Sequence, residues 1–141
     1  MIKLINAENR KDYLPYLLLA DENEDIINEY INDGEMYAIT SENQTIGVCL
    51  FIFPEINVVE IKNIAIIFSK QGKGLGKAVI QEACTFFRRR GYAQLIVGTA
   101  NSSIANIIFY QKTGFHMEAI RKNFFHRIQN LFTKMGFKQL T

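Results

Sequence analysis

Excess charge of either sign is missing from this 141-residue sequence, whose formal net charge is only +2. A nucleic-acid binder that neutralises many phosphates needs a larger positive charge, so that class is excluded. Long apolar runs are also missing: none can cross a bilayer, and residues 1–8 lack the apolar core of a signal peptide. We therefore expect a soluble, cytoplasmic protein without a membrane or nucleic-acid partner.

Cysteine is scarce as well. Cys49 and Cys84 stand in apolar or helical surroundings, and neither has a Cys or His at the spacing of metal ligands. We expect two buried free thiols in a reducing compartment and no metal site. Internal repeats, low-complexity stretches and linkers rich in Pro, Gly or Ser are absent. Because 48% of the residues are apolar, the chain can form a core, which predicts a single domain over residues 1–141.

Apolar periodicity and turn residues predict a mixed α/β sheet, in which strands alternate with helices only in the second half of the chain. The predicted strands cover residues 2–5, 36–40, 45–53, 58–68, 95–99 and 115–120. The predicted helices cover residues 8–20, 24–32, 77–90 and 102–112. Gly34 is predicted to stop the second helix, residues 41–44 to form a polar hairpin turn, and Pro54 to end the third strand.

A glycine-rich loop at residues 71–77 joins the predicted strand at 58–68 to the helix that follows. Helix N-termini carry backbone N–H groups without partners and favour negative charge, and glycines let a phosphate approach the backbone. The unit therefore predicts a pyrophosphate site. A Walker loop is excluded because three residues, not four, separate its glycines, and Ala78 stands where a Ser or Thr would bind magnesium. A dinucleotide fingerprint is excluded because Lys77 replaces its third glycine.

The remaining pattern, Gln-x-x-Gly-x-Gly at Gln71, Gly74 and Gly76, resembles a loop of the GNAT superfamily of acetyltransferases. In that family the loop wraps the pyrophosphate of coenzyme A. Residues 109–115 resemble the second signature of the family, an aromatic-Tyr-x-x-x-Gly-Phe segment. The resemblance extends over about residues 2–120, and the spacing between the two signatures also fits.

This resemblance implies a GNAT fold: a central, twisted, mixed and mostly antiparallel sheet, flanked by helices and splayed between its fourth and fifth strands. It implies an N-acetyltransferase that transfers an acetyl group from acetyl-CoA to a primary amine by direct attack in a ternary complex, without a metal. The amine can belong to a small molecule or to a peptide. Two alternatives stay open: a GNAT-fold module that binds acyl-CoA without turnover, and a different nucleotide-binding α/β protein.

The resemblance also implies roles for individual residues. Backbone groups of Ala65 and Ile66 hold the pantetheine arm and the acetyl carbonyl, and backbone N–H groups of residues 72–77 bind the pyrophosphate. Asn101 or Asn106 flanks the pantetheine. The cofactor-binding residues implied in this way are Ala65, Ile66, Gln71, Gly72, Lys73, Gly74, Leu75, Gly76, Lys77, Asn101 and Asn106.

Tyr110 is the general acid that the resemblance implies, because a phenol can give its proton to the leaving thiolate and regain it from water. The alternative is a core aromatic with a satisfied hydroxyl. Glu60 is the candidate general base, since family members often carry a carboxylate on this strand, and its alternative is a solvated strand-edge acid. The acids within residues 21–25 could attract a cationic amine, although an ordinary solvated helix start explains them equally well.

The end of the chain departs from the family, whose members usually complete the sheet with a further strand. The apolar spacing of residues 126–137 predicts a short helix instead. We therefore expect the C-terminal strand to be missing, which leaves a sheet edge open to a second chain and favours a homodimer. A frameshift that replaced the original ending would account for this tail, and the nucleotide sequence of the gene tests that hypothesis.

Overall fold

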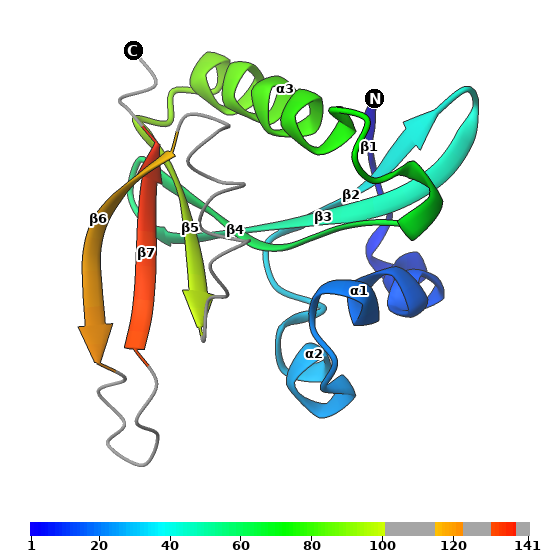
Figure 1. The fold of residues 1–141 in the computed structure, drawn as a ribbon, viewed down its shortest axis with the longest axis horizontal. Helices are drawn as coiled ribbons and strands as arrows, with labels where there is room; N and C mark the ends of the chain where they lie inside the picture. Colours follow the sequence, from blue (N-terminus) through cyan, green and yellow to red (C-terminus); the bar gives the residue numbers. More distant parts are fainter. Residues whose placement is uncertain (101–114, 123–130, 138–141) are drawn as a thin grey trace.

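A seven-stranded sheet organises the chain, in the order β1-β2-β3-β4-β5-β7-β6. It is seen in a computed structural model, which describes residues 1–100, 115–122 and 131–137 (Figure 1). The strands are β1 Ile2–Leu4, β2 Glu35–Ser41, β3 Gln44–Glu55, β4 Val58–Ile66, β5 Gln94–Ala100, β6 Phe115–Lys122 and β7 Leu131–Phe137. Neighbouring strands are antiparallel except β4 and β5, which are parallel. The prediction of a mixed, mostly antiparallel sheet is therefore confirmed.

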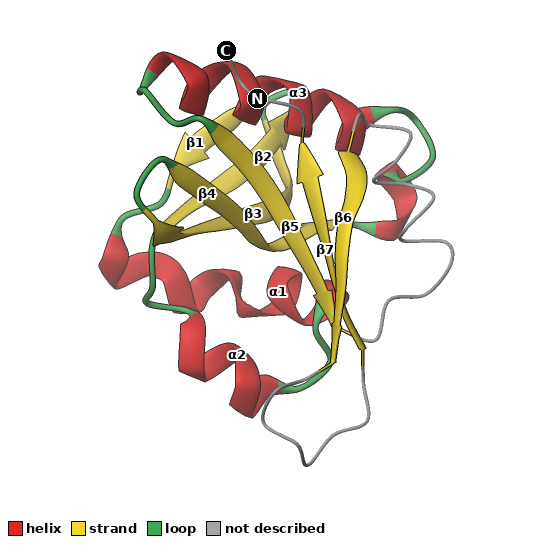
Figure 2. Ribbon diagram, turned by 90° about the vertical axis from the view of Figure 1, so that its left-hand side faces the viewer, coloured by secondary structure: helices red, strands yellow, loops and turns green. Residues whose placement is uncertain are grey.

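Helices cover both faces of this sheet. α1 (Leu14–Ala20) and α2 (Glu24–Tyr30) pack on one face, and α3 (Leu75–Arg89) packs on the other (Figure 2). Short 3₁₀ helices precede α1 at Ala7–Tyr13 and follow β4 at Phe68–Lys70. None of the helices in the described ranges is long and apolar enough to cross a membrane.

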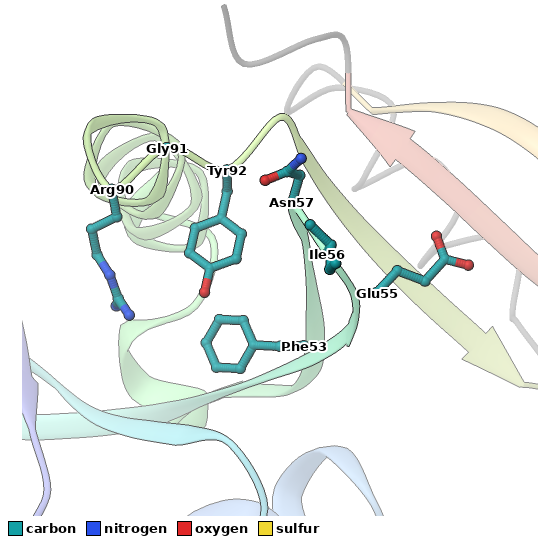
Figure 3. A pocket seen from close by; sticks show the side chains of 7 residues that line it. All are labelled: Phe53, Glu55, Ile56, Asn57, Arg90, Gly91 and Tyr92. Carbon is teal, nitrogen blue, oxygen red and sulfur yellow. The ribbon is translucent and has the colours of Figure 1, made fainter.

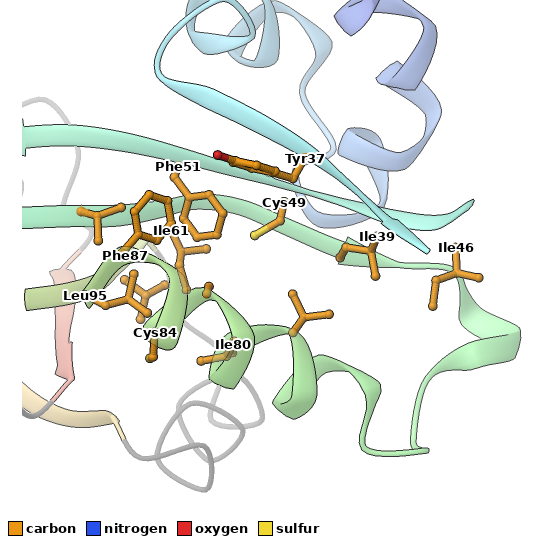
Figure 4. Close-up of a cluster of buried hydrophobic side chains, with 14 residues drawn as sticks. Tyr37, Ile39, Ile46, Cys49, Phe51, Ile61, Ile80, Cys84, Phe87 and Leu95 are labelled. Carbon is orange, nitrogen blue, oxygen red and sulfur yellow. The ribbon is translucent and has the colours of Figure 1, made fainter. Parts of the chain in front are cut away.

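The core on the α3 side forms because one face of α3 is apolar. The buried residues of this face recur at helical spacing and are Val79, Ile80, Ala83, Cys84 and Phe87. The ring of Phe87 meets the ring of Phe51 on β3 edge-on, with 4.7 Å between centroids (Figure 4). Cys49 and Cys84 are both buried free thiols, as predicted, and burial raises the pKa of each.

The predicted helix at 8–20 is divided at Pro15. Residues Ala7–Tyr13 form a 3₁₀ helix instead, and the N–H of Leu14 donates to the carbonyl of Lys11. Pro15 has no N–H and stands in the first turn of α1, where a helix tolerates a proline. The prediction of one continuous helix is therefore wrong, because the proline requires a new start.

The hairpins follow the predicted turn but not the predicted strand end. Glu42 and Asn43 have φ of 52° and 63°, the left-handed pair of a tight two-residue hairpin, which confirms the turn between β2 and β3. Pro54 does not end β3, which continues to Glu55. The ladder with β4 is irregular between Ile52 and Glu55. Pro54 has no N–H to donate, and it is accommodated there because a residue within a bulge makes no ladder hydrogen bond.

The prediction for the tail is wrong. Leu131–Phe137 forms β7 rather than a helix, and this strand lies between β5 and β6. Thr133, for example, pairs with Thr99 on one side and with Ile120 on the other. Spacing alone does not separate helix from strand in a short apolar run, and two ladders override local propensity. The expected gap in the sheet is filled, so it no longer supports a homodimer. Residues 126–130 and the predicted helix at 102–112 lie outside the described residues.

Candidate active site

β4 and β5 run side by side only at their beginnings. The parallel ladder joins residues 58–61 of β4 to residues 94–97 of β5 and ends there. β4 then continues to Ile66, while residues 98–100 of β5 pair with β7. In Figure 1, β4 crosses the view and β5 runs downward away from it. The two strands are splayed, as predicted.

An extra residue in β4 marks the point where the strands separate. Leu50 and Phe51 are adjacent on β3, but their partners on β4 are Asn63 and Ile61, so Lys62 is the additional residue of a β-bulge. A bulge bends its strand and shifts the alternation of side chains beyond it. β4 leaves β5 at Ile61, the residue before Lys62, so the bulge explains the splay.

The bulge also decides which face of the sheet each β4 side chain occupies. Val59 and Ile61 belong to the core on the α3 side, whereas Ala65 belongs to the core under α1 and α2. Glu60 alternates with Val59 and Ile61, so it points toward the α1–α2 face. Asn63 points the same way, since its amide contacts both helices. The extra residue makes Glu60 and Asn63 neighbours on that face.

Beyond the bulge, alternate backbone groups of β4 face the space that β5 leaves. The N–H of Ile67 donates to a β3 carbonyl at 2.8 Å, which fixes the alternation of the ladder. Ala65 therefore directs its N–H and C=O toward β3, while Ile64 and Ile66 direct theirs away from it. The carbonyl of Ala65 does lie against β3, since a Cβ added at Gly47 would meet its oxygen at 2.0 Å. Within the described ranges, no strand pairs with the outer edge at Ile64 and Ile66.

The glycine-rich loop follows directly from this edge. Gln71 holds the two together, because its Nε2 donates to the carbonyl of Ile66 at 2.8 Å. Gly72 and Gly74 have φ of 75° and 79°, in the left-handed region that favours glycine. A Cβ at either position would meet nothing within 4 Å. The backbone of the loop is therefore open to the approach of a ligand.

The start of α3 offers backbone donors to such a ligand. The helix begins at Leu75, two residues earlier than predicted, with Gly74 as an N-cap that makes no side-chain hydrogen bond. The N–H of Ala78 donates to the carbonyl of Gly74 at 3.1 Å. The N–H groups of the first turn before it have no acceptor within the helix, and the helix dipole favours an anion at this end. Lys73 and Lys77 are exposed beside it.

A hydrogen-bond network joins β4 to the helices on the other face. Asn63 is only 4% exposed, and its Nδ2 donates to the carbonyl of Leu17 at 3.1 Å and to the hydroxyl of Tyr30 at 2.9 Å. That hydroxyl donates to Asp21 at 3.2 Å. Burial is the main cause that raises the pKa of Tyr30 to about 12, so the hydroxyl is protonated at neutral pH. The Oδ1 of Asn63 has no hydrogen-bond partner among the described residues.

The structure thus brings the predicted residues 66 and 71–77 together where β4 leaves β5, whereas the backbone of the predicted Ala65 faces β3. Glu60 is half-buried on the same strand. Tyr110, Asn101 and Asn106 lie outside the described residues, and their roles stay predictions. Sequence reasoning missed the bulge and Asn63, although an amide inside an apolar strand is a usable signal because it must be hydrogen-bonded when buried. In the described ranges, no three His, Cys, Asp or Glu side chains gather as a metal site would require.

A pocket of about 450 Å³ lies at the other end of α3 (Figure 3). Phe53, Tyr92 and Arg90 line it together with the turn between β3 and β4. The guanidinium of Arg90 is already engaged, since it donates to both carboxylate oxygens of Glu35 at 2.7 and 2.8 Å. The 15-residue helix α3 separates this pocket from the glycine-rich loop. We therefore treat the two as distinct.

A splayed strand pair that leads into a glycine-rich helix start is found in a known family. The sequence model of the acetyltransferase (GNAT) family matches residues 2–115, and the chain belongs to this family. An uncharacterized N-acetyltransferase of Bacillus subtilis, YvbK, is 37% identical over 123 residues. That match covers 87% of this chain and 79% of the relative.

Solved structures of similar proteins contain CoA or acetyl-CoA. A Bacillus subtilis acetyltransferase in complex with CoA superposes with a TM-score of 0.81 and 32% identity over 97% of both chains. A GNAT family acetyltransferase from Elizabethkingia anophelis with acetyl-CoA bound gives a TM-score of 0.83 and 29% identity, over 98% of this chain and 97% of that one. The protein is an acetyl-CoA-dependent acyltransferase, with acetyl-CoA as its cosubstrate.

Proposed function

We propose that this protein transfers the acetyl group of acetyl-CoA to a primary amine, which attacks the thioester directly in a ternary complex. The observation that carries the proposal is the outer backbone edge of β4 beyond Lys62, which leads straight into the anion site at the start of α3. Such an edge can form backbone hydrogen bonds with an extended chain that carries amide groups, and the chain is then bound like an added strand. Pantetheine is a chain of this kind, and the pyrophosphate attached to it suits the helix start.

The alternation of the ladder supports an assignment of contacts along β4. Ile64 offers both backbone groups on the outer edge, and Ile66 offers its N–H, since its carbonyl accepts from Gln71. The backbone of Ala65 faces β3. We therefore propose Ile64 in place of Ala65 as the partner of Ile66 in holding pantetheine. The N–H of Ile64 would polarise the thioester carbonyl, where negative charge develops during attack.

The pyrophosphate contacts are proposed for the loop and the first turn of α3. Backbone N–H groups of residues 72–77 donate to the phosphate oxygens, and the left-handed Gly72 and Gly74 let these oxygens come close. The exposed Lys73 and Lys77 add positive charge at the rim. Gln71 acts indirectly, because it holds the loop against β4.

The chemistry needs proton transfers at the acceptor amine and at the leaving thiolate, and the α1–α2 face supplies the first. Glu60 takes a proton from the acceptor ammonium, directly or through a water, and the free amine attacks the thioester carbonyl. A C–N bond forms and the C–S bond breaks. Tyr110 gives its hydroxyl proton to the leaving thiolate, and the resulting phenolate regains a proton from the nitrogen of the new amide through a water. Orientation of the two substrates in one cleft provides much of the remaining acceleration.

Thiol release from acetyl-CoA over a panel of amines tests the proposal. The expected result is release of one thiol for each acetylated amine. Coenzyme A that binds without thiol release on any amine would indicate a binding module instead. Calorimetry with CoA, ATP and NAD tests the other alternative, a different nucleotide-binding α/β protein. Tight binding of ATP or NAD would contradict a coenzyme A site.

A further inference from the structure

Charge is divided unequally along this chain. Eleven of the fourteen acidic residues lie between positions 12 and 61, and this span contains no Lys, Arg or His. All sixteen Lys and Arg residues lie outside it. The small net charge of +2 is therefore the sum of two parts with opposite charge. The basic part suits a polyanion such as coenzyme A, and the acidic part suits a ligand of the opposite sign.

The fold gathers seven of these acids in one layer, which we call the acidic layer. It consists of residues 12–33, that is, the end of the first 3₁₀ helix, α1, α2 and their connection. Its acids are Asp12, Asp21, Glu22, Glu24, Asp25, Glu29 and Asp33. The layer covers the face of the sheet to which Glu60 and Asn63 point, and Figure 2 shows α1 and α2 on the side of the sheet opposite α3.

No ion pair in the described ranges neutralises the acidic layer. The ion pairs there are Met1–Glu82 and Arg90–Glu35, and neither includes a residue of the layer. Among the described residues, two cations contact the layer. The Nζ of Lys62 at the bulge lies over the ring of Tyr30 at 5.2 Å from its centroid, and the buried guanidinium of Arg10 donates to the backbone carbonyls of Ile31 and Asp33 at 2.9 and 2.7 Å. The layer has seven acids, so within the described ranges these two cations leave most of its negative charge uncompensated.

Helix stability accounts for only part of this charge. Glu24 and Asp25 lie in the first turn of α2, where the helix dipole favours acids, and Asn23 caps the same turn. Glu29 lies at the opposite end of α2, where the dipole disfavours an acid. Glu22 precedes the helix and is exposed. Neither of these two is explained by the stability of α2.

Asn63 points independently to a ligand that carries N–H groups. Its Nδ2 is held by the carbonyl of Leu17 and the hydroxyl of Tyr30, so the orientation of the amide is fixed. The buried Oδ1 that remains has no described partner, and an amide oxygen can only accept. Through Tyr30 this amide is connected to Asp21 of the acidic layer. A buried unpaired acceptor is unfavourable unless a donor reaches it.

We infer that the acceptor carries a second positive charge in addition to the amine that reacts. This inference rests on the proposed function and names its substrate class: a small diamine or polyamine, or a lysine of a basic peptide. The reacting ammonium loses its proton to Glu60. The second cation is held by carboxylates of the acidic layer around Glu22, and Oδ1 of Asn63 accepts an N–H from the ligand.

Matched amines test this inference through binding, without turnover. Cadaverine and n-pentylamine have the same chain length but carry two positive charges and one. Each is titrated by calorimetry into the full chain saturated with CoA. Cadaverine is expected to bind about tenfold more tightly, the size that two or three exposed ion pairs provide, and to lose this advantage in high salt. A blocked Lys-Lys dipeptide in a parallel titration separates a peptide acceptor from a free polyamine.

Two double variants with the same change of charge provide the control. Glu22→Gln with Glu29→Gln is expected to weaken cadaverine several-fold and to leave n-pentylamine unchanged. Glu42→Gln with Glu55→Gln, at the two hairpin turns, is expected to affect neither amine. Equal affinities of the two amines, no binding of either, or equal losses in both double variants would overturn the inference. Thiol release keeps the proposed function separate: cadaverine that binds but is not acetylated contradicts that function and leaves the charge preference standing.

Discussion

Two glycines with the same left-handed backbone stand at opposite ends of α3, and only one belongs to the proposed coenzyme A site. Gly74 has φ of 79° and Gly91 has φ of 94°. A Cβ added at either would meet nothing within 4 Å. The cost of an alanine at both positions is therefore backbone strain alone, about 1–2 kcal/mol. This makes the pair a matched test of the loop.

Gly74→Ala is expected to lower the melting temperature by a few degrees and also to weaken CoA binding, because it disturbs the first-turn N–H groups. Gly91→Ala is expected to cause a similar loss of stability without a change in CoA affinity. Thermal unfolding and a CoA titration of both variants measure these effects. If the two variants weaken CoA equally, the loop has no special role in binding.

Glu60 lies next to the point where β4 separates from β5, which is set by a single backbone feature, the bulge two residues further along β4. Glu60→Gln keeps the shape of the side chain but removes the base. We expect kcat to fall by about 100-fold at neutral pH and to recover partly as pH rises, because a larger share of the amine is then already deprotonated. A pH–rate profile of the variant measures this. Glu55→Gln, at the exposed turn between β3 and β4, is the control and should retain the profile of the parent. An unchanged kcat in Glu60→Gln would exclude the residue as the base.

Among the elements, β7 is the strand whose neighbours decide its conformation. It pairs with β5 and β6, so residues 132–136 have a strand on both sides. β6 is an edge strand, and its ladder shifts between Met117 and Ala119. A proline is tolerated at an edge or a bulge but not in the middle of a sheet.

Thr133→Pro in β7 is therefore expected to destabilise the fold by about 3 kcal/mol or more, and Glu118→Pro at the β6 irregularity by much less. The melting temperatures of the two variants test the position of β7. Equal losses would mean that residues 131–137 do not occupy a central place in the sheet.

The end of α3 is held to β2 by one charged contact. Arg90 donates to both oxygens of Glu35, and its guanidinium lies 5.2 Å from the ring centroids of Phe86 and Phe87. The hydrogen bond from Arg90 is the main cause that lowers the pKa of Glu35, and Tyr37 contributes a second one at 2.6 Å. A lowered carboxyl pKa stabilises the fold above the unfolded pKa, and this stability is lost as pH falls through the folded pKa.

Glu35→Gln is expected to lower the free energy of unfolding at pH 7 by about 1 kcal/mol, since the pair is partly exposed. The difference from the parent should shrink as the pH falls below the ordinary carboxyl pKa of about 4. Glu35 then gains a proton in the unfolded parent, and in the folded parent it does so only at a still lower pH, where the ion pair is lost. Thermal unfolding between neutral pH and about pH 3 follows this change. Glu42→Gln at the β2–β3 turn should show no such convergence, and a Glu35→Gln difference that is constant with pH would contradict the role of the ion pair.

At the scale of the whole molecule, local signals in the sequence were sufficient to predict the structure of a segment wherever that segment determines its own conformation. The polar residues 41–44 mark a hairpin by themselves, and the glycines of residues 71–77 mark a helix start by themselves. The bulge at Lys62 could not be predicted, because it exists only relative to β3. The strand at 131–137 was missed for a similar reason, since its two partners come from distant parts of the chain. The orientation of the backbone groups of Ile64 and Ile66 could not be predicted either, because it follows from the pairing of β4 with β3.

The whole molecule offers coenzyme A two kinds of contact, and salt should separate them. The β4 edge at Ile64 and Ile66 binds through neutral backbone groups, whereas the helix start and the exposed Lys73 and Lys77 bind phosphate through charge. Raising the salt from about 0.1 M to about 1 M shortens the screening length from about 10 Å to about 3 Å. The affinity of CoA is expected to fall several-fold, while that of pantetheine, which lacks phosphates, stays constant. Calorimetry with both ligands measures this. Lys77→Gln should reduce the salt dependence for CoA, and Lys11→Gln, in the 3₁₀ helix on the opposite side of the sheet, should not. If pantetheine weakens in parallel with CoA, the strand edge does not hold the neutral arm.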